Sequence, residues 1–97
     1  MDDDKLLREV ATGHRARDIL EDPTVQEVFR DIESRLHDAW AGSGATAADA
    51  REEIWRRLQA LKALRQELRL KFDKGRFAAD TLRKVEESRR ATSGSDT

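Results

Sequence analysis

Four basic residues at helical spacing are the best candidates for chemistry in this chain, and that chemistry is the binding of phosphate groups. On a helical projection at about 100° per residue, they form one ridge beside an apolar stripe; they are Arg51, Lys62, Arg65 and Arg69. Arginine binds phosphate through a planar guanidinium group, and lysine binds it as a point charge. Further basic residues near the carboxyl end are Arg83, Lys84, Arg89 and Arg90. All eight are candidates for contact with nucleic acid or with an acidic partner.

A structural role for the same residues is the alternative, and overall charge favours it. Long basic side chains often lay their aliphatic stems over a hydrophobic core while their charged ends meet carboxylates. The net charge is −1 and the isoelectric point is about 6.1, which weakens the case for nucleic-acid binding. Charge is unevenly distributed, since residues 1–50 have a balance of −6 and residues 51–90 a balance of +6. These two regions could attract each other within one chain or between subunits.

Motifs typical of catalysis or metal binding are missing from the sequence. His14 and His37 each have one acid a helical turn away, Asp18 and Glu33, which is ordinary surface spacing on a helix. The sequence has no cysteine, no glycine-rich phosphate loop and no G-x-S-x-G nucleophile motif. We therefore expect a protein that is not an enzyme, with no catalytic residue, no metal site and no cofactor.

Composition predicts an all-α protein. Charged residues make up 40% of the 97 residues, against roughly 25% in typical globular domains. The chain is rich in Ala, Leu, Arg and Glu, and it has one proline and no tyrosine. Such a composition suits long helices and coiled-coil-like packing. Apolar runs stay well short of the roughly 18 residues needed to cross a membrane, so we expect a soluble protein.

Capping signals and hydrophobic spacing predict the elements that would position the basic residues. Residues 4–20 form a weak helix or two short pieces, because Gly13 interrupts the pattern. Asp22 and Pro23 mark the start of a second helix over about 23–41. A third helix, about 47–74, ends at Gly75 as a glycine C-cap, and a fourth spans 76–90. Residues 1–90 then make a single helical domain, and residues 91–97 a disordered tail.

Apolar residues recur every three or four positions on the second and third helices. The short loop between these helices predicts an antiparallel helical hairpin. The residues predicted to pack in its core or between subunits are Val25, Phe29, Ile32, Leu36, Trp40, Ile54, Trp55, Leu58, Leu61, Leu64, Leu68 and Phe72. Because a two-helix hairpin leaves much of this apolar surface in water, an oligomer is expected.

An ordered set of motifs resembles a group of phage proteins. The motifs are Gly13-x-x-Ala16-x-x-Ile19-Leu20-x-x-Pro23-x-Val25, Trp40, Arg51-Glu52-x-Ile54-Trp55-x-x-Leu58 and Gly75-Arg76-x-Ala78. Over about residues 13–80, the chain resembles small helical proteins encoded in tailed-phage and phage-like gene clusters. The stretch around Leu20, Pro23 and Val25 is also similar to the segment that follows the DNA-binding region of some small terminase subunits.

That resemblance implies a packaging adaptor, because small terminases form rings of helical hairpins that hold DNA and engage the motor ATPase. Only about twenty residues precede Pro23, too few for a helix-turn-helix domain, so any DNA contact would rest on the basic residues. The resemblance also implies a location in the host-cell cytoplasm or in the virion. No membrane partner is expected, because the apolar runs are short.

The leading hypothesis is therefore a non-enzymatic, oligomeric assembly protein of phage type, similar to a small-terminase DNA-packaging component. Its partners would be further copies of the chain, a packaging motor ATPase and DNA. Two alternatives remain open. One is a nucleic-acid-binding module that uses the basic half, residues 51–90. The other is a small regulatory adaptor that binds a partner helix.

Overall fold

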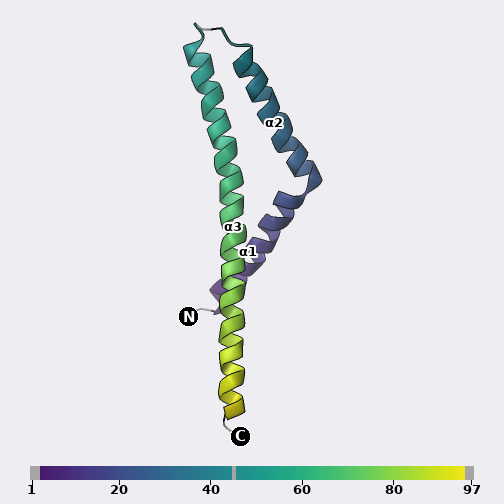
Figure 1. Cartoon of the computed structure of the whole chain (residues 1–97), viewed down its shortest axis with the longest axis vertical. Coiled ribbons are helices and arrows are strands. Elements are labelled where there is room, and N and C mark those ends of the chain that lie inside the picture. Colours follow the sequence, from purple (N-terminus) through teal and green to yellow (C-terminus); the bar gives the residue numbers. More distant parts are fainter. Residues whose placement is uncertain (1–2, 45, 96–97) are drawn as a thin grey trace. The chain divides into compact units, whose positions relative to one another are not determined.

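A computed structural model describes residues 3–44 and 46–95, with side chains as far as residue 92. Within these ranges the chain forms three helices and no strand: α1 (Asp3–Glu21), α2 (Pro23–Ala41) and α3 (Ala48–Ser95) (Figure 1). The protein is therefore all-α, as its composition predicts. It divides into two compact units, which we describe separately. Unit 1 comprises residues 1–17 and 69–97, and unit 2 comprises residues 18–68.

Asp22 and Pro23 set the boundary between α1 and α2. The Oδ1 atom of Asp22 accepts hydrogen bonds from the backbone N–H groups of Thr24, at 2.8 Å, and Val25, at 3.0 Å. Pro23 occupies the first turn of α2, where its missing amide hydrogen costs nothing. The predicted helix over residues 23–41 is confirmed, since α2 begins at Pro23 and ends at Ala41.

The first helix is continuous. The alternative of two short pieces is wrong, because α1 runs unbroken from Asp3 to Glu21. Gly13 lies inside it and is buried. A glycine in a helix interior costs about 1 kcal/mol relative to alanine, so packing must offset this cost.

The predicted helix end at Gly75 is also wrong. The predicted third and fourth helices form one element, α3, which runs from Ala48 to Ser95. A glycine C-cap commonly needs a positive φ, and no glycine among the described residues has one. The helix also continues through residues 91–95, where a disordered tail was predicted. The last two residues of that predicted tail, 96–97, lie outside the described residues.

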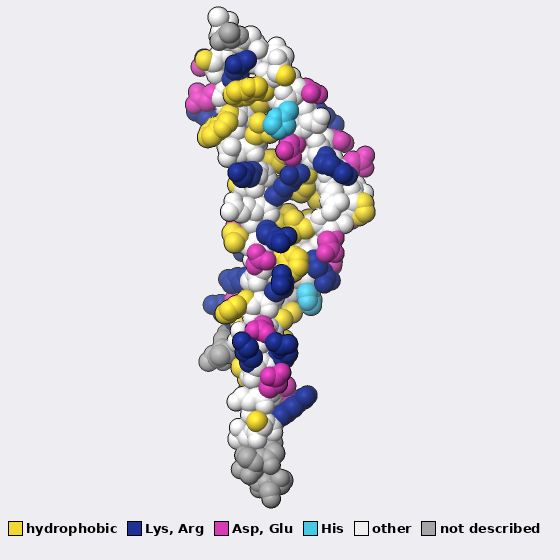
Figure 2. Space-filling model, viewed as in Figure 1, with side chains coloured by type: hydrophobic (Ala, Val, Ile, Leu, Met, Phe, Trp, Pro, Cys, Tyr) yellow, Lys and Arg dark blue, Asp and Glu magenta, His cyan; other side chains and the backbone are white. Residues whose placement is uncertain are grey.

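Few hydrophobic side chains are buried. Among the described residues, only Ala16, Phe29 and Ala78 are buried hydrophobics, whereas nine large ones are at least 37% exposed. The nine are Leu7, Ile19, Val28, Ile32, Trp40, Trp55, Leu64, Leu70 and Phe77. Four predicted packing residues are thus exposed (Ile32, Trp40, Trp55 and Leu64), and the others, apart from Phe29, are half-buried. Figure 2 shows hydrophobic side chains at the surface among charged ones.

Over residues 3–44 and 46–95, no helix has both the length and the apolar character that a membrane crossing requires.

Candidate functional site

Two of the predicted basic residues, Arg51 and Arg65, pack against α2 in unit 2. Arg65 Nη1 lies 3.2 Å from Glu33 Oε2, and its guanidinium carbon lies 4.9 Å from the centroid of the Phe29 ring. Phe29 is the one large side chain in the buried hydrophobic set. Arg65 is about 40% exposed, so its stem and its charge both serve the contact with α2.

Arg51 forms hydrogen bonds with Ser43 in the loop that follows α2. Its Nε donates to Ser43 Oγ at 2.6 Å and its Nη2 donates to the Ser43 carbonyl oxygen at 3.2 Å. The same guanidinium lies over the Trp40 ring, 5.3 Å from the centroid. Ser43 Oγ in turn donates to the Trp40 carbonyl oxygen at 2.6 Å. Arg51 therefore completes the C-terminal cap of α2, a structural task that uses two of its five N–H donors.

Lys62 lies on a shallow groove of unit 2 that has a mixed charge. The groove is lined by Glu33, His37, Leu58, Gln59, Leu61, Lys62 and Arg65. His37 Nε2 lies 3.8 Å from Glu33 Oε1, and this contact is an ion pair only when the imidazole is protonated. Because Glu33 already forms an ion pair with Arg65, the positive charge in this groove is partly compensated.

The remaining basic candidates lie in unit 1 and each is paired with an acid. Arg69 Nε lies 3.8 Å from Asp73 Oδ1, Arg89 Nη2 lies 3.1 Å from Asp3 Oδ2, and Arg90 Nε lies 3.4 Å from Glu86 Oε1. These pairs are exposed, so each contributes little to stability. They do reduce the positive potential that a nucleic acid would meet.

The last two basic candidates, Arg83 and Lys84, both pair with Asp80. Arg83 forms an ion pair with Asp80, and Lys84 Nζ lies 3.1 Å from the Asp80 Oδ2 atom. The hydrogen bond and the positive charge of Lys84, followed by Arg83, hold the pKa of Asp80 below its ordinary value of 3.8. Asp80 is therefore ionised at neutral pH. Six of the eight basic candidates thus lie beside acids, whereas Arg51 contacts Ser43 and Trp40, and Lys62 lines the groove.

Unit 1 contains a close glycine–glycine helix crossing, which the sequence analysis missed. There α1 meets α3 through Gly13, Ala16, Gly75 and Ala78, all of which are buried. A Cβ atom built on Gly13 would lie 2.7 Å from the Gly75 Cα, and one built on Gly75 would lie 2.7 Å from the Gly13 Cα. The two backbones are thus in direct contact, at a distance that no side chain permits.

The crossing is reciprocal. A Cβ on Gly13 would lie 3.1 Å from the Lys71 carbonyl oxygen, and one on Gly75 would lie 2.9 Å from that of Glu9. Each of these carbonyls belongs to the residue four positions before the opposite glycine. Beside the crossing, Lys74 Nζ lies 3.7 Å from Glu9 Oε1. A sequence signal existed, because the pattern Gly-x-x-Ala occurs in both helices.

The described residues contain no group of three or more histidine, cysteine or acidic side chains that could hold a metal ion. The chemistry that the arrangement supports is association, through exposed apolar side chains and partly compensated charges. No protein-family model, curated protein or solved structure matches this chain.

Proposed function

We propose that this chain is a non-enzymatic, oligomeric helical assembly protein. The observation that carries the proposal is the imbalance of its hydrophobic residues: among the described residues, three are buried and nine large ones are exposed. Folding must bury apolar surface to offset conformational entropy, and a chain of this size buries only a modest fraction of its surface alone. Association between copies would cover the remaining apolar area.

The subunit of this assembly is an antiparallel hairpin of α2 and the first part of α3. Two contacts within unit 2 support it. Trp40, near the end of α2, packs with Arg51 near the start of α3. Phe29, nearer the start of α2, packs with Arg65, which is further along α3. The order of contacts is reversed between the two helices, as an antiparallel pair requires.

The assembly is of phage type and resembles a small-terminase component of DNA packaging. This part rests on the ordered motifs of residues 13–80 and on the stretch around Leu20, Pro23 and Val25. Its partners would be further copies of the chain, the packaging motor ATPase and DNA. Because six of the eight basic candidates lie beside acids, we favour subunit association over nucleic-acid binding as the main activity.

The test is the solution mass of the purified protein, by light scattering after size-exclusion chromatography, at low and high salt and over a range of concentrations. A discrete mass of many subunits that persists on dilution is the expected result. A monomer or a dimer would refute a ring of subunits like that of the small terminases. It would favour an adaptor whose exposed apolar residues bind a partner helix.

A further inference from the structure

The exposed side of α3 in unit 1 carries a regular alternation of charge. At steps of four and three residues the sign reverses each time, through Arg69, Asp73, Arg76, Asp80, Arg83, Glu87 and Arg90. These seven residues, the alternating stripe, lie within an arc of about 100° on a helical projection. Some of their charges pair within the helix, since Arg69 meets Asp73 and Arg83 meets Asp80. Such pairing is common on solvated helices.

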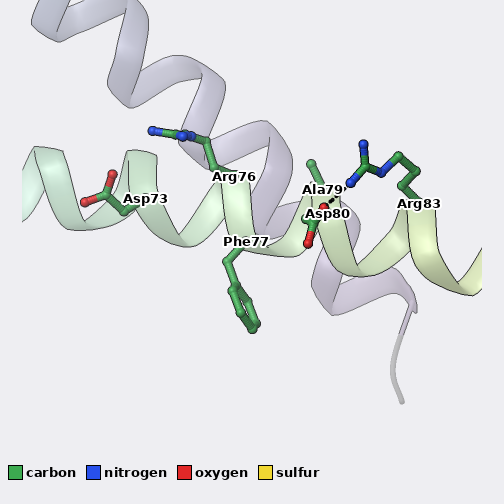
Figure 3. Close-up of a pocket in the computed structure, with 6 residues that line it drawn as sticks. All are labelled: Asp73, Arg76, Phe77, Ala79, Asp80 and Arg83. Carbon is green, nitrogen blue, oxygen red and sulfur yellow. Dashed lines mark hydrogen bonds and ion pairs between the residues drawn. The ribbon is translucent and has the colours of Figure 1, made fainter.

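Ion pairs within the helix do not explain why Phe77, which lies beside this stripe, is exposed. Phe77 is 74% exposed, more than any other large hydrophobic residue described. In Figure 3 its ring and the Arg76 side chain leave α3 on opposite sides of the view, with Asp73, Asp80 and Arg83 along the same stretch of α3. Leu70 precedes Phe77 by seven residues, on the same side of the helix, and is 54% exposed. An apolar face with an ordered charge pattern at its edge is typical of a helix that pairs with another helix.

We propose that this face, made of Leu70, Phe77 and the alternating stripe, binds the same face of a second copy of the chain. The two copies are antiparallel, with the twofold axis near residue 78. The inference rests on the self-association proposed above and names its surface. In a twofold contact, if residue i meets residue j of the other copy, then j meets i. About residue 78, Arg76 lies opposite Asp80 of the second copy, and Asp73 lies opposite Arg83. Each of these pairs occurs twice and joins opposite charges.

The apolar residues fit the same arrangement. Phe77 lies one residue from the axis, so the two Phe77 rings meet. Lys84 of the second copy lies opposite position 72, about 3 Å along the helix from Leu70, so its aliphatic stem can cover Leu70. A parallel pair in register would instead place every residue of the alternating stripe opposite its own equivalent, with the same sign. Because like charges that face each other are strongly unfavourable at an interface, the stripe selects the antiparallel orientation.

A typical specific interface buries roughly 800 Å² per partner, and one face of a single helix offers little surface beside that. The contact therefore adds to a larger assembly rather than making a tight dimer alone, and the experiment should trap it covalently. The chain has no cysteine, so each introduced thiol has one possible origin.

The experiment mixes two single variants, Leu70→Cys and Lys84→Cys, under mild oxidation, and compares the mixture with each variant alone on a non-reducing gel. The antiparallel contact predicts a disulfide-linked dimer that is several times more abundant in the mixture. Equal linking by either variant alone would overturn the proposed register. The absence of linked dimer, with a wild-type protein that is still a large oligomer, would overturn this contact and leave the proposed function standing.

Charge exchange gives an independent readout. Arg76→Asp places two like-charged pairs across the contact and should reduce the abundance of the trapped dimer about tenfold. Adding Asp80→Arg to the same chain restores opposite charges and should restore the dimer. The matched control is Arg57→Asp, which changes another exposed arginine of α3 outside this face.

Circular dichroism checks that each variant remains helical. If Arg76→Asp behaved like Arg57→Asp, or if the double change failed to recover the dimer in a folded protein, the contact would be excluded. If the link forms as expected but the wild-type protein never exceeds a dimer, this contact stands and the ring is refuted.

Discussion

The two units of this protein pack their helices in opposite ways. In unit 1, Gly13 and Gly75 bring two backbones into contact, and the flanking residues are small. In unit 2, the contact is made by large side chains, with the Arg65 guanidinium over the Phe29 ring and paired with Glu33. A backbone contact has no room for an added methyl group, whereas long side chains can adjust. We therefore expect unit 1 to be sensitive to added atoms, and unit 2 to be sensitive to the loss of side-chain atoms.

The largest effect is expected in unit 2 from Phe29→Ala. Phe29 is buried, and removing a buried aromatic ring typically costs about 3 kcal/mol or more. The free energy of unfolding, measured by urea denaturation, should fall by that order. The control is Val28→Ala on the same helix, because Val28 is 49% exposed. An equal loss for both variants would show that Phe29 is not the centre of unit 2.

A smaller but more diagnostic effect is expected in unit 1 from Gly75→Ala. In an ordinary helix, alanine is more favourable than glycine by about 1 kcal/mol. Here the new Cβ would lie 2.7 Å from the Gly13 Cα and 2.9 Å from the Glu9 carbonyl oxygen. Both are backbone atoms, so the helices must separate, and we expect a net loss of about 1–2 kcal/mol.

Hydrogen exchange of the α1 amides would locate that loss, since they should exchange faster in Gly75→Ala than in the wild-type protein. Gly44→Ala serves as the control, because a Cβ on Gly44 meets no atom within 4 Å. A gain in stability for Gly75→Ala would mean that α1 does not pack against Gly75, and the contrast between the units would disappear.

The smallest effect is expected from Arg65→Met, which keeps an apolar stem but loses the contact with the Phe29 ring and the ion pair with Glu33. Both partners of that ion pair are about 40% exposed, so we expect a loss of about 1 kcal/mol or less. The part due to the ion pair should shrink at high salt. If stability were unchanged at every salt concentration, Arg65 would have no structural role in this contact. The phosphate-binding role predicted from its spacing would then be favoured.

Local signals predicted α2 well, and distant contacts explain what they missed. Asp22 and Pro23 act within the turn that they begin, so the sequence around them is sufficient. Glycine at position 75 fits either a helix end or a close helix crossing. The residue that decides between them is Gly13, far away in the chain, and one sequence read locally does not connect the two.

The basic ridge illustrates the same limit. Helical periodicity places Arg51 and Arg65 on one side of their helix, beside the predicted apolar stripe. Their roles depend on Trp40 and on Phe29, which lie on another helix. A projection of one helix shows which residues share a side, but it does not show which of them are covered. The sequence therefore offers pairing with carboxylates as one of two roles for these residues, but it does not identify the partner of each one.

The order of the units along the chain has a consequence for synthesis. Unit 2 is one continuous segment, whereas unit 1 joins the two ends of the chain. Contacts between distant residues form more slowly, because a long loop must close first. Since the ribosome makes the amino end first, Gly13 and Ala16 leave it well before Gly75 and Ala78 exist to cover them. We therefore expect α1, although it is made before α2 and α3, to pack after them.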